Sequence, residues 1–522
     1  MPLGKADHDN VALLPGLSLL ARVNAATSQW SQVLRSNCSS LNASPRELVV
    51  CFYLKFGDSY AYFACSQILV LYLHQEFGIS DIEAGAAYGM WGVSITFWGL
   101  ACSVFNDYLG VRRAMLLGFT LSSLSYFALA CATTKTFLYC VLFVILPLGN
   151  SLGIPMISIG IKRFTTTQNR GFAFAVFYAI MNLAAFISGP VIDAFTIGLS
   201  PRGLVLSTTA PRWSAIRCII LTAALSSLTS LVVTALLLKE DGGVDKDKGA
   251  AESAPQTFEE RRANLWKLVT SVTFLRFSVL TLLLINLNAI FRHLDATFPT
   301  FVVRTFGTNA PKGMLYAINP LMIMLLVPLV GALTTGYKHF DMIKWGGYVT
   351  AAAPLCLAAS VTIPGAIGMV ILLSLGEAIW SPRTYDYTYS IAPDGQEASF
   401  AALATAPLFA AKIPVGLLSG WLLSTFCPET GPKRGDLLWL IVAVVTLTSP
   451  ILITLLEKRI REPEPESSSP PVVLSEAEMP GAMGAGGLSA GGHGHGRGEG
   501  EEIEGEEFSG IELSSSSSHN LL

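Results

Sequence analysis

The sequence predicts an all-α polytopic membrane protein whose twelve transmembrane helices form two pseudo-symmetric six-helix bundles. Only 14% of the 522 residues are Asp, Glu, Lys or Arg, whereas 52% are hydrophobic; a soluble protein carries about 25% charged residues. Apolar runs of about 20 residues, the length that crosses a bilayer as a helix, recur twelve times. A charged segment separates the first six runs from the last six. A soluble enzyme is therefore excluded.

The positions of the apolar runs divide the chain into domains. The runs begin near Glu47, Ala84, Arg113, Thr136, Gly171, Ser214, Ser271, Pro311, Ile343, Pro364, Ser399 and Leu437. We therefore expect an N-terminal arm (1–46), an N-terminal bundle (47–238), a linker (239–270), a C-terminal bundle (271–457) and a tail (458–522). The tail is rich in Glu, Ser, Pro and Gly, which predicts disorder.

Charge sets the expected orientation and partners. If the N-terminus is cytoplasmic, the cytoplasmic segments hold about three times as many Lys and Arg residues as the opposite loops. Arm, linker and tail are then all cytoplasmic, whichever membrane holds the protein. The net charge of -3 shows no basic excess for binding nucleic acid. The expected partners are membrane lipids and a small-molecule solute, and we expect the protein to be a monomer. No CxxC or Cys/His cluster indicates a metal site, and no cofactor is expected.

The two halves show traces of an internal repeat. LGNSLGIP, which begins at Leu148, parallels LGEAIWSP, which begins 227 residues later at Leu375. Gly189 and Gly416 have the same separation. A similar match relates FG at 77–78 with Gly85 to FG at 306–307 with Gly313. A gene duplication explains these repeats.

A short motif lies between the second and third apolar runs. In FNDYLGVRR, Asp107, Gly110, Arg112 and Arg113 have the spacing DxxGxRR. Gly110 permits a tight turn, and the two arginines can meet the negative inner leaflet. With the two six-helix halves, this motif resembles the cytoplasmic loop signature of the major facilitator superfamily. The resemblance implies the major facilitator fold, with Asp107 pairing across the interface between the halves.

Three segments resemble the proton-coupled oligopeptide transporter group within that superfamily. FGDSYAYFACSQILVLYL is similar to its first span. The segment with Arg170, Tyr178 and Asn182 is similar to its fifth span, and GEAIWSP places Glu377 where the group has a glutamate in span ten. However, Lys55 and Asp58 replace acidic residues of the group's first-span motif, so the resemblance leaves the solute open.

Ionisable residues within the apolar runs are the candidate transport groups, because a charge at the bilayer centre is costly unless it faces a cavity or a partner. They are Lys55, Asp58, Glu377 and Lys412 near mid-depth, and Arg292, His293 and Asp295 in the seventh run. A carboxylate in a poorly hydrated cavity can bind a proton near neutral pH. Asp58 and Glu377 are therefore candidates for binding a proton or pairing with a cation.

The basic residues of this set can attract an anionic group on the solute; they are Lys55, Lys412 and Arg292. The alternative is that Lys55–Asp58 and Arg292–Asp295, both spaced i,i+3, are structural ion pairs. Pro155 and Pro382 occupy matching positions in the fourth and tenth runs. We expect them to bend these helices as the two halves rock about a central site.

These features predict a secondary active transporter that moves a small organic solute by alternating access and is coupled to protons. No Walker motif is present in the sequence, and no catalytic constellation indicates an enzyme. The alternative from another class is a transporter-like receptor or sensor that signals through its linker and acidic tail.

Overall fold

A computed structural model describes residues 41, 44–166, 169–199, 213–239, 266, 270–334, 337–392, 400, 403–404 and 410–461. Its secondary structure is helical, as predicted, and eight of the described helices are long and apolar enough to cross a membrane. Each predicted start except Ser399 lies within four residues of the start of a helix. Ser399 lies outside the described residues, as do most of the arm, linker and tail.

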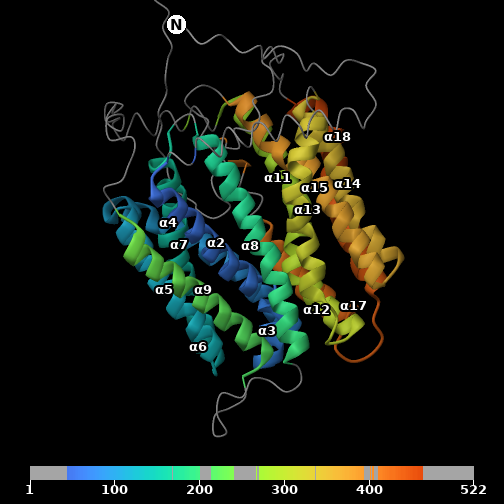
Figure 1. The fold of residues 1–522 in the computed structure, drawn as a ribbon. Coiled ribbons are helices and arrows are strands. Elements are labelled where there is room, and N and C mark those ends of the chain that lie inside the picture. The colour runs from blue at the N-terminus through green and yellow to red at the C-terminus, as the bar shows by residue number, and fades with distance from the viewer. Residues whose placement is uncertain are drawn as a thin grey trace, which may run out of the picture. The chain divides into compact units, whose positions relative to one another are not determined.

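The helices fall into two groups along the chain (Figure 1). The first group contains α2 (Arg46–Ser66), α3 (Leu69–Phe77), α4 (Asp81–Leu109), α5 (Val111–Cys131), α6 (Lys135–Cys140), the π-helical stretch η1 (Val141–Ile145), α7 (Leu146–Arg163), α8 (Arg170–Gly198) and α9 (Ala215–Leu237). The second group contains α11 (Val272–Ala296), α12 (Phe298–Phe306), α13 (Lys312–Leu333), α14 (His339–Ala359), α15 (Ile363–Ile391), α17 (Lys412–Phe426) and α18 (Gly435–Ile460).

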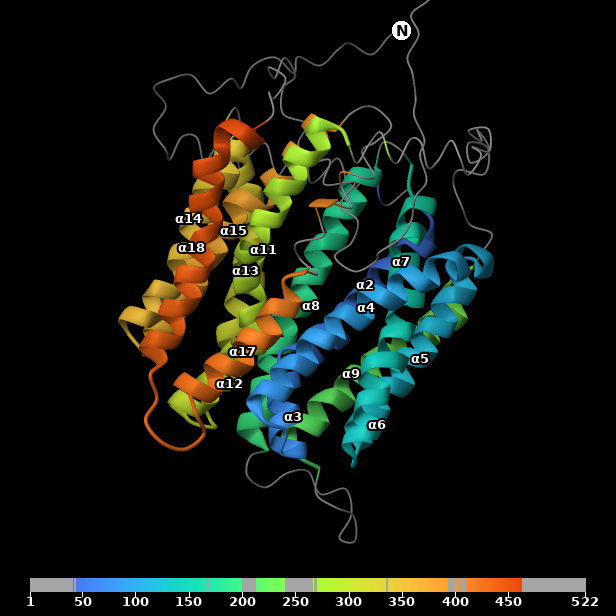
Figure 2. The ribbon, with the colours of Figure 1, turned by 180° about the vertical axis from the view of Figure 1, so that it is seen from behind.

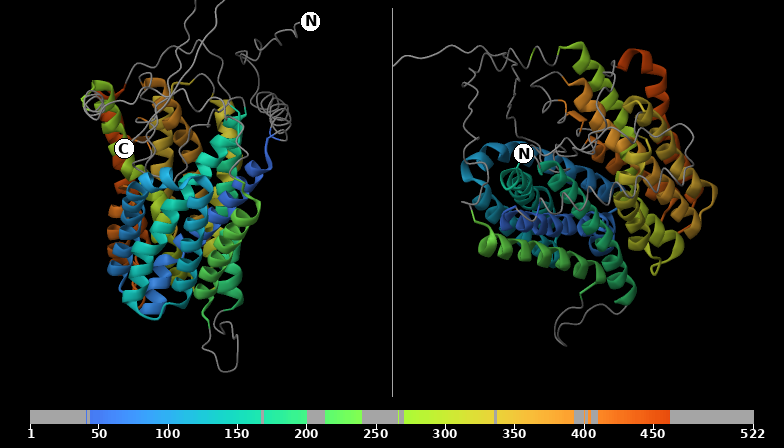
Figure 3. Two further views of the ribbon diagram at one scale, coloured as in Figure 1. Left: turned by 90° about the vertical axis from the view of Figure 1, so that its left-hand side faces the viewer. Right: turned by 45° about the horizontal axis from the view of Figure 1, so that its top comes forward.

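Each group is a helical bundle with its own packing, and two helix pairs form the most extensive contacts between the bundles. In the first, α2 packs on α7, α8 and α9; in the second, α14 packs on α15 and α18. Between the groups, α4 packs on α17 and α8 packs on α13. Figures 2 and 3 show the blue-to-green group beside the yellow-to-orange group.

The repeat-matched glycines lie at these two contacts between the bundles. A Cβ on Gly85 would collide with the backbone of Gly416, and a Cβ on Gly189 would collide with the backbone of Gly313. Gly85 matches Gly313 in the repeat, and Gly189 matches Gly416. At these duplicated positions the backbones of the two halves are in direct contact, because glycine leaves room for it.

The first and seventh predicted spans are each broken into two helices, which the sequence analysis did not predict. The break between α2 and α3 lies at Gln67, whose Nε2 donates to Oγ of Ser188 at 2.8 Å. The break between α11 and α12 lies at Thr297, whose hydroxyl donates to Ser419 Oγ at 2.9 Å. Both breaks occur at corresponding places in the repeat, and a side-chain bond to a neighbouring helix supports each.

The two prolines expected to interrupt their spans lie inside continuous helices, Pro155 in α7 and Pro382 in α15. A proline removes the N–H that would bond to the carbonyl four residues earlier, which for Pro155 is the carbonyl of Ser151. Nδ2 of Asn106 on α4 donates to that oxygen at 3.0 Å. The neighbouring helix therefore satisfies the freed carbonyl, and α7 continues.

Candidate functional site

Lys412, at the start of α17, lies inside a cage of aromatic rings from the first bundle. Its Nζ donates to the hydroxyl of Tyr62 at 2.7 Å and lies 5.1, 5.7 and 4.7 Å from the ring centroids of Tyr62, Tyr88 and Trp91. Only 3% of Lys412 is exposed. Its stem packs on Gly92, where a Cβ would lie 2.5 Å from Cδ of the lysine. The glycine therefore provides the space that the lysine occupies.

Asp295 on α11 links Tyr88 to Arg292. The Tyr88 hydroxyl donates to Oδ2 of Asp295 at 3.1 Å, and Nη1 of Arg292 lies 3.3 Å from the same oxygen. The side chain of Asp295 is 1% exposed. The predicted Arg292–Asp295 pair is thus an ion pair that is also bonded to the first bundle. Tyr88 contacts Lys412 as well, so these groups form one cluster, which we call the central cluster: Tyr62, Tyr88, Trp91, Arg292, Asp295 and Lys412.

Glu377 on α15 is held by neutral partners. Nδ2 of Asn319 on α13 donates to Oε2 of Glu377 at 2.9 Å and to Oγ of Ser374 at 3.1 Å. Among the described residues, no ion pair to Glu377 is found. The structure therefore places this carboxylate in the second bundle with an amide, and not a basic side chain, as its hydrogen-bond partner.

Lys55 and Asp58 on α2 are both buried, yet they form no ion pair within the described part of the chain. Nζ of Lys55 instead lies 4.4 Å from the centroid of the Phe177 ring on α8. A cation over an aromatic face gains electrostatic attraction from the ring. The Lys55–Asp58 pair considered from the i,i+3 spacing is therefore not formed here.

The DxxGxRR motif forms the turn between α4 and α5. Gly110 has a φ of 74°, a backbone conformation that favours glycine. Arg112 donates from Nε to the carbonyl of Leu238 at 2.8 Å and from Nη2 to that of Ala235 at 2.9 Å. It thus binds the carbonyls at the end of α9, where the helix lacks internal partners. Arg113 is exposed, and the side chain of Asp107 lies outside the described residues.

The residues matched to the fifth span lie on α8. Arg170 donates from Nη2 to the carbonyl of Lys162 at 3.4 Å, and Nδ2 of Asn182 donates to the carbonyl of Tyr178 at 3.1 Å. Tyr178 packs against a buried cluster that includes Val327 of α13. Tyr178 thus contributes to the α8–α13 contact and Asn182 bonds within its own helix, whereas Arg170 closes the turn before α8.

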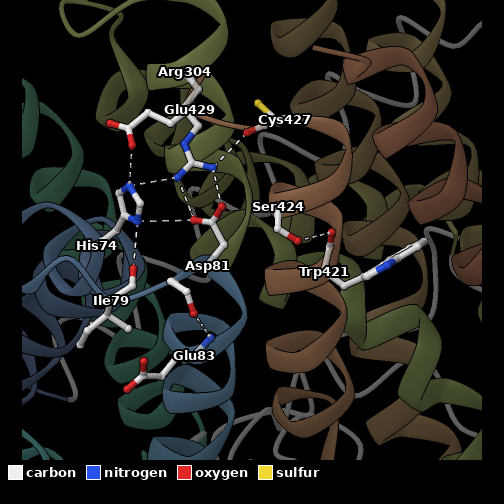
Figure 4. Close-up of polar contacts among 10 residues, drawn as sticks. His74, Ile79, Asp81, Glu83, Arg304, Trp421, Ser424, Cys427 and Glu429 are labelled. Carbon is white, nitrogen blue, oxygen red and sulfur yellow. Dashed lines mark hydrogen bonds and ion pairs between the residues drawn. The ribbon is translucent and has the colours of Figure 1, made fainter. Parts of the chain in front are cut away.

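A second polar cluster, which the sequence analysis missed, joins the bundles at the end where α3 and α12 finish. Nη1 and Nη2 of Arg304 donate to the two carboxylate oxygens of Asp81 at 2.8 and 2.7 Å, and Nη2 lies 3.3 Å from Nε2 of His74 (Figure 4). The exposed Glu429 lies 3.3 Å from the same His74 nitrogen. We call these four residues the Arg304 cluster. Asp81 lies three residues after Gly78, and Arg304 lies three residues before Gly307. Because these two glycines match in the repeat, their neighbourhood is a sequence signal that could have located both residues.

The α8–α13 contact has its own polar link, also missed. Oδ1 and Oδ2 of Asp193 accept from the backbone N–H groups of Gly313 and Met314 at 2.9 and 2.7 Å. Nζ of Lys312 donates to Oγ1 of Thr196 at 2.7 Å. Asp193 thus caps the first turn of α13 from the other bundle, an arrangement that favours a carboxylate because the helix N-terminus is partly positive.

The described residues contain no group of three or more His, Cys, Asp or Glu side chains arranged to hold a metal ion. Chemically, the central cluster offers buried cations, a carboxylate and tyrosine hydroxyls drawn from both bundles. Such a set can bind a polar solute and exchange protons with it. The Arg304 cluster and Asp193 instead hold one end of the interface together.

Comparison with known proteins identifies relatives that match most of the helical region. A family model described as Major Facilitator Superfamily matches residues 52–411. An uncharacterized MFS-type transporter, YhjO of Bacillus subtilis (strain 168), is 24% identical over 391 residues, 74% of this chain and 87% of that protein.

Solved structures share the fold at low identity. A POT family transporter in complex with a thioalcohol-conjugated peptide has a TM-score of 0.63 and 17% identity, covering 80% of this chain and 97% of its own. A variant of the nucleoside transporter NupG has a TM-score of 0.62 and 14% identity, covering 78% and 99%.

Proposed function

The chain belongs to the Major Facilitator Superfamily, and from that membership we propose that it is a secondary active transporter of a small organic solute, coupled to protons and working by alternating access. Membership makes it a multi-pass integral membrane transporter and not an enzyme. The nature of the solute, the coupling to protons and the alternating-access movement are the parts that we propose. The relatives leave the solute open, because one is uncharacterized and the solved structures share the fold alone.

The observation that carries the proposal is the contact of buried ionisable groups across the interface between the bundles. Lys412 of the second bundle bonds to Tyr62 of the first, and Tyr88 of the first bonds to Asp295 of the second. These bonds must break or rearrange when the bundles rock against each other. Solute binding at this cluster can therefore be linked to the movement that exposes the site to either side.

Glu377 and Asp58 are the proposed proton-binding groups. Each is a carboxylate within a bundle that forms no ion pair among the described residues, so protonation would remove an uncompensated charge from a buried position. The Asn319 amide bonded to Glu377 can stay bonded to either protonation state, because the neutral acid retains an acceptor oxygen.

We also propose that both termini are cytoplasmic and that the protein acts as a monomer. The Lys and Arg bias between the two sets of loops supports the orientation. Under it, the Arg304 cluster lies on the non-cytoplasmic side, so the structure corresponds to a state closed on that side. The receptor or sensor alternative depends on the linker and tail, most of which lie outside the described residues.

The test uses the full chain reconstituted in liposomes and a panel of metabolites at two pH values, including short peptides, amino acids, organic acids and nitrate-like anions. We expect uptake of at least one solute to rise severalfold with an inward proton gradient. Glu377→Gln should abolish the gradient dependence, because glutamine cannot bind and release a proton. Asp436→Asn, a change at an exposed carboxylate of α18, is the matched control and should transport normally.

Two outcomes would contradict the proposal. Uptake that ignores the gradient would remove proton coupling and leave facilitated diffusion. Full gradient-driven uptake in both Glu377→Gln and Asp58→Asn would show that these carboxylates are not the proton-binding groups.

A further inference from the structure

We infer that Lys412 and the hydroxyl of Tyr62 together bind an oxyanion of the transported solute, and that the solute therefore belongs to the class of small monocarboxylates. The inference rests on the proposed transport function and names the chemistry of its cargo. It assigns the anion to one place in the central cluster, the aromatic cage formed by Tyr62, Tyr88 and Trp91.

The ammonium group of Lys412 has more donors than the structure satisfies. A lysine ammonium carries three N–H donors, and Tyr62 Oη is the hydrogen-bond acceptor found for it among the described residues. No carboxylate in that part of the chain forms an ion pair with Lys412. Three aromatic faces attract the cation but accept no strong hydrogen bond. A buried ammonium in this condition lacks both a counter-charge and two acceptors.

The neighbouring hydroxyls determine which donors remain for a ligand. Tyr88 donates its hydroxyl proton to Asp295, so that proton is already used. Tyr62 accepts from Lys412 and therefore keeps its own O–H proton for another acceptor. Two ammonium protons and one tyrosine proton are thus available within a single cage. A carboxylate, with two oxygens and about four lone pairs, can accept all three.

The cage is built into the packing of the two bundles. The stem of Lys412 packs on Gly92, and a Cβ at Gly89 would lie 3.2 Å from the carbonyl oxygen of Lys412. Because α4 presents glycine at both positions, the lysine is held against one helix face, unlike a mobile surface lysine. An anion bound here would contact α2 of the first bundle and α17 of the second, and its binding would depend on their relative position.

Charge balance favours a monocarboxylate over a dianion. The nearby Arg292 is already paired with Asp295, so Lys412 supplies one uncompensated positive charge. A monocarboxylate neutralises it, whereas a dianionic phosphate or sulfate would leave one negative charge in a buried site. Within the protein, Asp58, one turn before Tyr62 on α2, is the carboxylate that could compete with a ligand for Lys412. In the structure Asp58 forms no ion pair with Lys412.

The experiment measures ligand-induced stabilisation and tryptophan fluorescence of the full chain in detergent. The probes are acetate, lactate, phenylacetate and nicotinate, each paired with its neutral amide, with inorganic phosphate as a further arm. We expect at least one carboxylate to raise Tm saturably, with its amide and phosphate binding at least tenfold more weakly. Lys412→Gln should weaken that binding at least tenfold, and Lys412→Arg should keep it within about threefold. Lys338→Gln, at an exposed lysine before α14, should bind normally.

Tyr62→Phe provides a test that does not depend on the folding of the lysine variant, because it removes only the hydroxyl. Weaker carboxylate binding by a Tyr62→Phe variant with an intact fold supports the anion site. Unchanged binding in either Tyr62→Phe or Lys412→Gln overturns it. So does equal binding of carboxylate and amide, or the absence of binding by every carboxylate. Preference for phosphate overturns the monocarboxylate class.

The two proposals fail separately. Gradient-driven uptake of a neutral or cationic solute would keep the transport proposal and overturn the anion site. Carboxylate binding that depends on Lys412, without gradient-driven uptake of that carboxylate, would keep the anion site and contradict proton-coupled transport.

Discussion

Asp295 is bonded through one carboxylate oxygen to both bundles, since Oδ2 lies near Arg292 and accepts from Tyr88. Arg292→Gln should lower the free energy of unfolding by about 3 kcal/mol, because it leaves a buried carboxylate without its counter-charge. Adding Asp295→Asn should recover most of that loss. Unfolding in detergent measures both variants, and a double variant as unstable as the single one would contradict the charge argument.

At the scale of single residues, spacing along the chain predicted one partner correctly and could not predict others. The i,i+3 spacing suggested Arg292–Asp295, which is formed, and equally Lys55–Asp58, which is not. The difference arises because Phe177, more than a hundred residues away, provides an aromatic face for Lys55. Mid-depth position identified Lys412, but its partner Tyr62 is 350 residues distant. Such partners depend on how the bundles pack, which local sequence does not encode.

Among the elements, α7 shows how a neighbouring helix lets a proline stay inside a span. Asn106 of α4 bonds to the carbonyl of Ser151 that Pro155 leaves free. Asn106→Ala should therefore destabilise the fold by about 2 kcal/mol, the cost of a buried acceptor without a donor. Pro155→Ala added to that variant should restore stability, because an alanine at that position supplies the missing N–H. Thermal unfolding tests this cycle, and additive losses in the double variant would contradict it.

Helix α13 begins with a cap supplied by the other bundle, because Asp193 of α8 accepts from the N–H groups of Gly313 and Met314. Asp193→Ala should weaken this end of the α8–α13 contact by about 1 kcal/mol, the usual value of an N-cap. Hydrogen exchange at residues 313–314 should then accelerate about fivefold. The exposed control Asp436→Asn should leave that exchange unchanged, and equal exchange in Asp193→Ala and the wild type would contradict the cap.

The sequence predicted the helices better than their interruptions. Apolar run length located eleven of the twelve starts within four residues, because bilayer thickness imposes one length on every span. Pro155 and Pro382 predicted bends in the fourth and tenth runs, whereas the breaks at Gln67 and Thr297 in the first and seventh runs were not predicted. No proline lies at Gln67, but Pro299 follows Thr297 in the first turn of α12 and is a sequence signal for the second break. Each of the two side chains also bonds to another helix. Interruptions of this kind follow from tertiary partners.

At the scale of the whole molecule, contacts at the α3–α12 end hold the two bundles together there. The glycine pairs, the Asp193 cap and the Arg304 cluster all lie towards that end, and they join residues up to 355 positions apart. The internal repeat identified these four glycines, but it did not predict that Gly85 contacts Gly416 and that Gly189 contacts Gly313. Duplication explains why the two contacts are symmetric. In the repeat α4 corresponds to α13 and α8 corresponds to α17, so the α4–α17 and α8–α13 contacts join equivalent helices.

Opening of the α3–α12 end requires separation of Arg304 from Asp81, whose side chains are 7% and 9% exposed. Arg304→Gln should therefore shift the equilibrium towards the open form by roughly 1.4 kcal/mol, a factor of about ten. Spin labels at Lys135→Cys and Ser360→Cys, exposed positions on the two bundles at that end, should then report a longer distance in a cysteine-free chain. Arg434→Gln breaks the exposed pair with Asp436 and should leave the distance distribution unchanged. The same distribution in Arg304→Gln and the wild type would show that this end stays closed without the Arg304–Asp81 pair, through the glycine contacts and the Asp193 cap.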